Sequence, residues 1–162
     1  MSIQKAEIND ADIIAPLIAK FRVELLTYKN IMAEENNEYA RDEFNEYVLA
    51  GYPIYIFKDN NECLGYLVCR IDNDVVWVES LFVLKEHRRC GIAAALFNAA
   101  EKLAASYGND TLYNYVHPNN DEMIGFLAKR GYNVLNLIEI RKKRKDEVIN
   151  EQINIRNNTF DY

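Results

Sequence analysis

The sequence predicts an α/β domain of the α+β kind, with a mixed, mostly antiparallel sheet flanked by helices and a central β-α-β crossover. Two observations carry this prediction. Three segments rich in β-branched and aromatic residues follow one another in the middle of the chain, separated only by short clusters of Asp and Asn. A segment rich in alanine and leucine then stands between two strand-like segments, which is the pattern of a crossover.

The first third of the chain is predicted to form one strand and two helices. Residues 3–8 alternate between apolar and polar side chains, which indicates a short strand. Asp10 is a cap-type residue ahead of a periodic apolar stretch over residues 12–26, which indicates an amphipathic helix. A second helix is expected within residues 30–51, ending at Gly51.

The three central segments are predicted to be consecutive antiparallel strands at residues 52–58, 63–71 and 75–83, joined by turns that include Asp59 to Asn61. The remaining elements are expected to be a helix over 91–107, a strand over 111–116, a helix over 120–130 and a strand or strand pair over 132–141. Residues 1–141 are therefore predicted to form one domain. The charged, Asn-rich tail over 142–162 is left unassigned.

Composition and charge exclude several classes of function. A chain of 162 residues, 49% hydrophobic, is suited to one compact core. It has no secretory signal pattern, and its apolar stretches are shorter than the ~20 residues of a membrane span. The three cysteines form no CxxC pair and the two histidines lack metal-ligand spacing, so we expect reduced thiols, a cytoplasmic protein and no metal. A net charge of -6 argues against nucleic acid and favours a cationic substrate.

The most informative stretch runs from Val75 to Phe97, where a hydrophobic strand meets a basic turn and then a helix of small residues. Such a helix start presents backbone N–H groups at the positive end of the helix dipole, which suits phosphate oxygens. The residues expected to do this are Arg88, Arg89, Cys90, Gly91, Ile92 and Ala93. The alternative is that Gly91 merely begins a helix beside a solvated basic patch. The P-loop pattern GxxxxGK[ST] is absent, and alanines replace the later glycines of GxGxxG.

The RxxGxA formed by Arg88, Gly91 and Ala93 resembles the [QR]xxGx[GA] signature with which acetyltransferases of the GNAT superfamily bind the coenzyme A pyrophosphate. The segment before it, ESLFV, and the helix after it match the context of that signature. A later run, HPNNDEMIGFLAKRGY, resembles the family's NxxAxxFYxxxGF region through Asn120, Phe126, Gly131 and Tyr132. The order of elements across residues 1–141 agrees as well.

This resemblance implies a GNAT-like fold with acetyl-CoA as cosubstrate. Backbone groups of Leu81, Phe82 and Val83 are then expected to pair with the pantetheine arm, as an added strand pairs with a sheet edge. The resemblance further implies that Asn120 lies near the pantetheine or phosphate end of the cosubstrate. It places Phe126 in the adjoining wall.

Acetyl transfer to an amine needs a base, because free alkylamines are mostly protonated near neutral pH. In several members of the family a glutamate at the position of Glu79 is proposed to serve, acting through water. The alternative is that Glu79 is simply an outward-facing strand residue. The tyrosine that usually protonates the leaving thiolate is replaced by Leu127. Three other tyrosines, or a water molecule, are candidates in its place: Tyr113, Tyr115 and Tyr132.

Other candidate residues stay open at this point. Cys90 lies at a helix start where a thiol can become a nucleophile, although that motif position is variable. His117 is a candidate for the acceptor pocket. Tyrosines and acids of the first two helices are predicted either to form a pocket that attracts an amine or to be an ordinary helical face. They are Tyr28, Tyr39, Tyr47, Glu34, Glu35 and Glu38.

The chain is therefore expected to be an N-acetyltransferase that moves an acetyl group from acetyl-CoA to a primary amine of a small molecule, by direct attack in a ternary complex. Two alternatives stay open. One is acetylation of a protein or peptide, for which the same core would serve. The other is a non-catalytic acyl-CoA-binding module, which the leucine at position 127 motivates. No nucleic-acid or membrane partner is expected, and a homodimer is one arrangement that relatives adopt.

Overall fold

The structure is a computed structural model that describes residues 2–60 and 62–162, so Asn61 of the predicted turn lies outside the described residues. The chain divides into a first unit that ends at Phe126 and a second unit from Leu127 to Tyr162.

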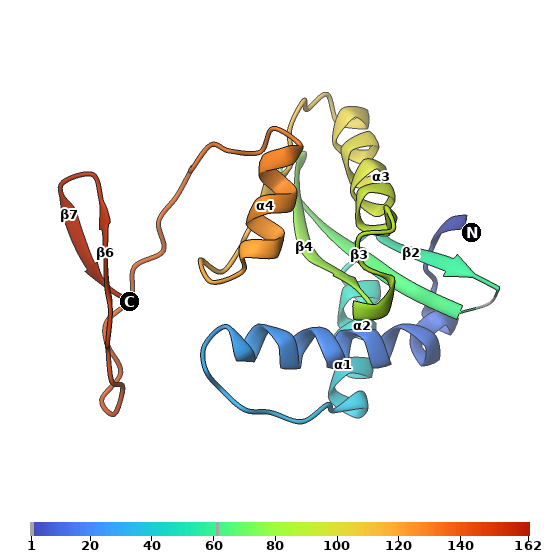
Figure 1. Ribbon diagram of the computed structural model, residues 1–162. Helices are drawn as coiled ribbons and strands as arrows, with labels where there is room; N and C mark the ends of the chain where they lie inside the picture. The colour runs from blue at the N-terminus through green and yellow to red at the C-terminus, as the bar shows by residue number, and fades with distance from the viewer. Residues whose placement is uncertain (1, 61) are drawn as a thin grey trace. The chain divides into compact units, whose positions relative to one another are not determined.

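The first unit is built on a five-stranded sheet of order β1-β2-β3-β4-β5 (Figure 1). The strands are β1 (Ser2–Lys5), β2 (Ile54–Asp59), β3 (Glu62–Asp72), β4 (Val75–Val83) and β5 (Tyr113–Asn114). The first four pair antiparallel, and β4 and β5 pair parallel through the helix between them. The prediction of a mixed, mostly antiparallel sheet with a β-α-β crossover is confirmed.

In the described part of the chain up to residue 129, four α-helices and two short 3-10 helices complete the elements. They are η1 (Ile8–Asp10), α1 (Ala11–Thr27), α2 (Asn37–Leu49), η2 (Lys85–His87), α3 (Ile92–Ser106) and α4 (Asp121–Lys129). In α1, buried side chains recur at helical spacing, among them Ile14, Leu17 and Ile18, so one face of the helix turns toward the sheet. Asn36 caps α2 by accepting a hydrogen bond from the N–H of Tyr39 at 2.9 Å.

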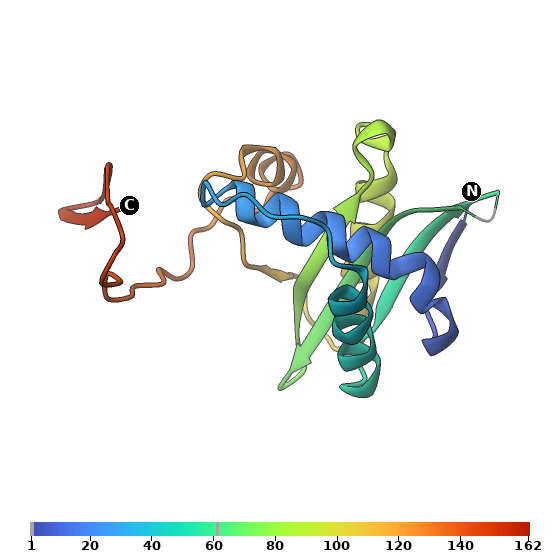
Figure 2. The same ribbon diagram turned by 90° about the horizontal axis from the view of Figure 1, so that it is seen from below.

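The helices cover both faces of the sheet (Figures 1 and 2). Phe21 of α1 contacts Tyr66 and Phe82, with ring centroids 6.4 and 5.9 Å apart. Gly65, the neighbour of Tyr66, turns to the opposite face because side chains alternate along a strand. A Cβ built on Gly65 would lie 3.4 Å from the Ile92 side chain of α3. The sheet is therefore sandwiched between α1 on one side and α3 on the other.

A bulge in β4 and the short length of β5 shape the sheet edge. Val68 pairs with Ser80 but the next residue of β3 pairs with Val78, so Glu79 is an extra residue that forms a β-bulge. Strand β5 pairs with β4 only at Trp77 and Val78 and is shorter than the predicted strand over 111–116. β4 therefore continues to residue 83 beyond the end of β5, and the two strands form a fork.

The second unit contains a hairpin that was not predicted. The prediction of a strand or strand pair over 132–141 is wrong, because these residues form no ladder with any described residue. The hairpin lies in the tail, where β6 (Gln152–Ile155) pairs antiparallel with β7 (Asn158–Asp161) across a two-residue turn. Alternating side chains show which residues can share a face, whereas a strand also requires a partner for its backbone. Among the described residues no helix is long and apolar enough to cross a membrane.

Candidate active site

The edge of β4 beyond the fork presents backbone groups that take no part in the ladder with β3. Leu84 donates its N–H to the carbonyl of Leu64 at 3.0 Å, so these two residues form a hydrogen-bonded antiparallel pair. Because bonded and non-bonded pairs alternate, the N–H and C=O groups of Val83 and Leu81 face away from β3, toward the open edge. The same alternation directs the backbone of Phe82 toward β3. Two of the three residues predicted to pair with pantetheine therefore present their backbone to that edge.

The loop after β4 leads directly into the start of α3. Arg89 and Gly91 adopt left-handed conformations, with φ of 63° and 85°, and Gly91 is the N-cap residue of α3. No side chain caps this helix and its first turn holds no acidic residue, so N–H groups such as those of Ile92 and Ala93 are left for another acceptor. A Cβ on Gly91 would meet no atom within 4 Å. These features fit a diphosphate at the positive end of the helix.

An unpaired polar atom lies at the base of the fork. Asn114 is the last residue of β5, and its side-chain Oδ1 is buried without a hydrogen-bond partner among the residues that the structure describes. Buried acceptors of this kind are rare in folded proteins. Its position beside the open edge of β4 fits an amide N–H of an extended ligand. Sequence reasoning missed Asn114, because only the pairing of β5 with Val78 brings it to the fork.

The side chain of the signature arginine, Arg88, contacts protein groups. Its Nε donates to the carbonyl oxygen of Val83 at 3.0 Å, and its Nη2 lies 2.7 Å from Oε2 of Glu24 in α1. Its Nη1 contacts Glu122 of α4 at 3.0 Å. The neighbouring Cys90 is exposed, with its thiol Sγ 3.5 Å from the Arg88 carbonyl oxygen.

Asn120 and Phe126 make contacts that organise α4 within the first unit. The Oδ1 of Asn120 accepts a hydrogen bond from the N–H of Met123 at 3.0 Å, which caps the helix. The ring of Phe126 packs edge-on against Phe97 of α3, with centroids 5.4 Å apart. Their predicted contacts with the cosubstrate stay predictions.

Glu79 and Tyr115, two of the predicted catalytic residues, lie around one aromatic side chain at the fork. Glu79 is exposed at the bulge, and its Oε2 is 3.4 Å from Nε of Arg70. The Arg70 guanidinium lies over the Trp77 ring, 5.2 Å from its centroid. Tyr115 stacks on Trp77 at 4.9 Å, and Tyr113 lies at 4.8 Å. Tyr115 directly follows the last residue of β5 and is mostly exposed.

Tyr132, the third predicted catalytic residue, belongs to the second unit. Its backbone N–H donates to the carbonyl of Leu127 at 3.0 Å, and Gly131 before it has a φ of 87°. This is the usual glycine-containing end of a helix. A role of Tyr132 in protonating the thiolate stays a prediction.

A polar cluster below α1 was not predicted from the sequence. Glu43 accepts hydrogen bonds from Arg22 Nε at 2.8 Å and from the Tyr47 hydroxyl at 2.5 Å. Burial raises the pKa of Tyr47, and the hydrogen bond to Glu43 raises it further. Beside it, Ser80 is the one buried polar residue of the described chain, and its hydroxyl donates to that of Tyr66 at 2.8 Å. The sequence did hold one signal for this cluster, because Arg22 lies within the apolar stripe of the helix predicted over residues 12–26.

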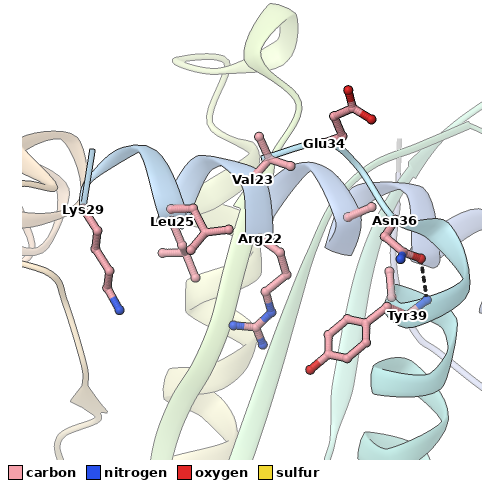
Figure 3. A pocket seen from close by; sticks show the side chains of 10 residues that line it. Arg22, Val23, Leu25, Lys29, Glu34, Asn36 and Tyr39 are labelled. Atoms are coloured by element: carbon pink, nitrogen blue, oxygen red, sulfur yellow. Dashed lines mark hydrogen bonds between the residues drawn. The ribbon is translucent and has the colours of Figure 1, made fainter. Parts of the chain in front are cut away.

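A pocket of about 340 Å³ lies between α1, the connection over residues 28–36 and α2 (Figure 3). Its polar lining consists in part of Arg22, Lys29, Glu34 and Tyr39. In Figure 3 the side chains of Arg22, Lys29 and Tyr39 extend to the same side of α1. The remaining wall is mainly apolar.

The six residues predicted to attract an amine are only partly gathered at this pocket. Tyr39 and Glu34 line it. Glu35 forms an ion pair with Lys20 at 3.3 Å, and Glu38 lines a second pocket. Tyr47 belongs to the Arg22 cluster, while Tyr28 stacks on His117 at 6.1 Å. No group of three or more His, Cys, Asp or Glu side chains in the described part of the chain is arranged to hold a metal ion.

A forked sheet edge followed by an uncapped helix start is an arrangement suited to an extended ligand that ends in a diphosphate. Residues 21–132, more than half of the chain, match the model of the acetyltransferase (GNAT) family. The chain belongs to this family of acetyl-CoA-dependent acetyltransferases. The predicted family, enzyme class and cosubstrate are confirmed at this level.

Solved structures share the fold. The aminoglycoside N-acetyltransferase AAC(6')-Iy, in complex with the bisubstrate analogue CoA-S-monomethyl-acetylneamine, is 16% identical with a TM-score of 0.70, over 88% of this chain and 97% of that one. The aminoglycoside 6'-N-acetyltransferase AAC(6')-IG from Acinetobacter haemolyticus is 17% identical with a TM-score of 0.67, over 90% of this chain and 100% of that one. The ribosomal-protein-alanine N-acetyltransferase from Brucella melitensis biovar Abortus 2308 is 15% identical with a TM-score of 0.64, over 89% of this chain and 100% of that one. No curated protein sequence matches the chain.

Proposed function

We propose that the chain transfers the acetyl group of acetyl-CoA to a primary amine of a small molecule, by direct attack in a ternary complex. The observation that carries this proposal is the position of Glu79. It is the bulged residue of β4 at the fork, two residues before the free backbone groups of Leu81. A carboxylate therefore stands next to the strand edge on which the thioester would lie.

The binding of acetyl-CoA follows from the two ends of this edge. The backbone of Leu81 and the N–H of Val83 would pair with the pantetheine amides, as in addition of a strand to a sheet, while the Val83 carbonyl keeps its hydrogen bond from Arg88. The buried Oδ1 of Asn114 would accept one further amide N–H. The N–H groups at the start of α3 would bind the diphosphate, with Gly91 leaving room for it.

The transfer needs two proton movements. Glu79, acting through a water molecule, would take the proton of the ammonium group, since only the neutral amine is a nucleophile. The amine nitrogen then attacks the thioester carbonyl, so a C–N bond forms and the C–S bond breaks. The nitrogen is positively charged after the attack and loses its second proton, and a proton passes to the departing thiolate through Tyr115, through Tyr132 or through water. A thiol with a pKa near 8.5 needs little assistance in leaving.

The proposed acceptor is a cationic small molecule. The net charge of -6 attracts cations. In the pocket beside α1, Tyr39 and Glu34 offer an aromatic face and a carboxylate, next to Lys29 and to Arg22, whose charge Glu43 balances. Two structural neighbours are aminoglycoside acetyltransferases, so amino sugars are the first acceptors to try. Polyamines and amino acids are the next.

A thiol-release assay with acetyl-CoA tests the proposal. Turnover is expected with at least one small amine from a panel of aminoglycosides, polyamines and amino acids. Turnover confined to peptide amino termini would show a peptide acetyltransferase instead. Saturable binding of acetyl-CoA without turnover of any amine or peptide would show a binding module, as Leu127 in place of tyrosine suggests.

Replacement of Glu79 by glutamine tests the base. The expected result is a loss of about 10²- to 10⁴-fold in kcat with little change in the affinity for acetyl-CoA. Glu62→Gln is the matched control, because Glu62 is an exposed glutamate at the far end of β3. Equal pH-rate profiles for Glu79→Gln and the unmodified enzyme would remove Glu79 from the mechanism.

A further inference from the structure

The contacts of Arg88 connect three separate elements. Its Nη2 lies 2.9 and 2.7 Å from the two carboxylate oxygens of Glu24 in α1. Its Nε donates to the Val83 carbonyl oxygen, and its Nη1 reaches Glu122 of α4. The guanidinium also lies over the Phe82 ring, 5.5 Å from the centroid. The side chain thus holds the end of β4 against two helices.

The two acidic partners of Arg88 differ sharply in burial. Glu24 is only 17% exposed, whereas Glu122 is 76% exposed. Solvent screens the exposed pair, so it contributes little, while loss of one partner from a part-buried pair leaves a poorly solvated charge. Glu24 is therefore the partner that determines where the guanidinium lies.

Glu24 is itself held by a wider set of contacts. The Tyr28 hydroxyl donates to its Oε1 at 3.4 Å, and burial, together with the Glu24 charge, raises the pKa of Tyr28 to about 12. The Tyr28 carbonyl accepts a hydrogen bond from Asn119 Nδ2 at 3.0 Å, and its ring stacks on His117. The end of α1 is therefore tied to the segment between β5 and α4.

We propose that Glu24 is a positioning residue of the cosubstrate site, and that the signature arginine acts through it rather than by touching the phosphates. The pair sets the direction of the chain where it leaves Val83 and enters the loop with Gly91. That loop carries the N–H groups for the diphosphate. This inference rests on the proposed placement of acetyl-CoA along β4 and at the start of α3.

The geometry favours this role over direct phosphate binding. Three donor nitrogens of Arg88 are each within 3.0 Å of a protein oxygen, so turning the guanidinium toward a phosphate would break the contact with the Val83 carbonyl and with Glu24. Arg89, next along the chain, is exposed at a φ of 63° and provides a nearby positive charge. The site therefore keeps a basic side chain even while Arg88 is engaged.

The experiment is a double-mutant cycle on acetyl-CoA binding, measured by calorimetry. Glu24→Gln and Arg88→Met are each expected to weaken binding about ten- to 150-fold, the range for losing a hydrogen bond to a charged group. The double variant should bind no more weakly than Arg88→Met alone, because Glu24 acts only through Arg88. Glu122→Gln, which removes the exposed partner of the same guanidinium, should stay within twofold of the unmodified protein.

Two further readouts separate positioning from general loss of structure. The KM for acetyl-CoA should rise in Glu24→Gln while kcat is retained. The dependence of binding on salt concentration should be the same in Arg88→Met as in the unmodified protein, since no phosphate contact is lost. If Glu24→Gln does not fold, Arg88→Lys serves in its place, because lysine keeps the charge but cannot reach all three acceptors.

Several outcomes would overturn the proposal. If Arg88→Met weakens binding and flattens its salt dependence while Glu24→Gln leaves affinity unchanged or tighter, Arg88 binds phosphate directly. Additive losses in the double variant would make the two residues independent. If the unmodified protein does not bind acetyl-CoA, the proposed function itself fails, and this result is distinct from a failure confined to the variants.

Discussion

Gly65 lies in β3 opposite Val83, so its replacement by alanine tests how closely the central strands and α3 pack. The added Cβ would lie 2.8 Å from the Phe82 carbonyl oxygen, 3.1 Å from Val83 Cγ2 and 3.4 Å from Ile92 Cγ2. The first contact is with backbone, so β4 has to move. Overpacking lowers the free energy of unfolding by about 1–3 kcal/mol. Alanine also makes the unfolded chain less flexible than glycine does, which raises the free energy of unfolding by about 0.4–1 kcal/mol. We expect a net destabilisation of about 1–2 kcal/mol.

Urea unfolding followed by circular dichroism measures this change, and the melting temperature should fall by roughly 2–8 °C for a chain of this size. Gly125→Ala is the matched control. Gly125 lies inside α4, and a Cβ there would meet no atom within 4 Å. Alanine should therefore stabilise α4 by about 0.5–1 kcal/mol. Gly65→Ala should also weaken acetyl-CoA binding, because the displaced part of β4 includes Val83.

The reasoning is refuted if Gly65→Ala unfolds at the same urea concentration as the unmodified protein, or at a higher one. That result would mean that β3 and β4 are further apart than the structure places them. If Gly65→Ala loses stability but binds acetyl-CoA with unchanged affinity, the close packing of β3 and β4 is supported. The contact proposed between Val83 and acetyl-CoA is then contradicted.

Three further predictions concern the loop and the thiols. Gly91→Ala places a Cβ at a φ of 85°, which costs about 1–2 kcal/mol, so acetyl-CoA affinity or stability should fall by that amount in calorimetry and urea unfolding. At pH 8 a thiol reagent should modify Cys90 alone in the native chain, with acetyl-CoA protecting it; fast reaction of a second thiol would contradict this. Burial raises the pKa of Cys63 to about 11 and of Cys69 to about 12, against 9.0 unfolded. The unfolded thiols therefore lose their protons first, and the free energy of unfolding should fall by roughly 2 kcal/mol per thiol between pH 8 and 10.5, a loss that Cys69→Ala should reduce.

Local chemistry was enough to predict most elements of the first unit. The β-branched segments, the Asp/Asn turns and the helical periodicity all reflect interactions within a few residues, so β2, β3, β4 and α3 came out within two residues of their bounds. The strand predicted over 132–141 failed because a strand depends on a partner that the local pattern does not specify. The bulge at Glu79 was missed for the same reason, since it exists only in the register between two strands.

The motifs of the sequence were enough to recognise the family, and they predict an anion site at the start of α3, because a glycine with left-handed φ and a helix without a cap are local properties. The contacts of the site residues, in contrast, depend on the folded chain. Arg88 belongs to the signature, yet its partner Glu24 lies 64 residues earlier in the chain. Asn114 lies at the fork only because β5 stops where β4 continues. Contacts between distant segments depend on packing, and packing cannot be read from neighbouring residues.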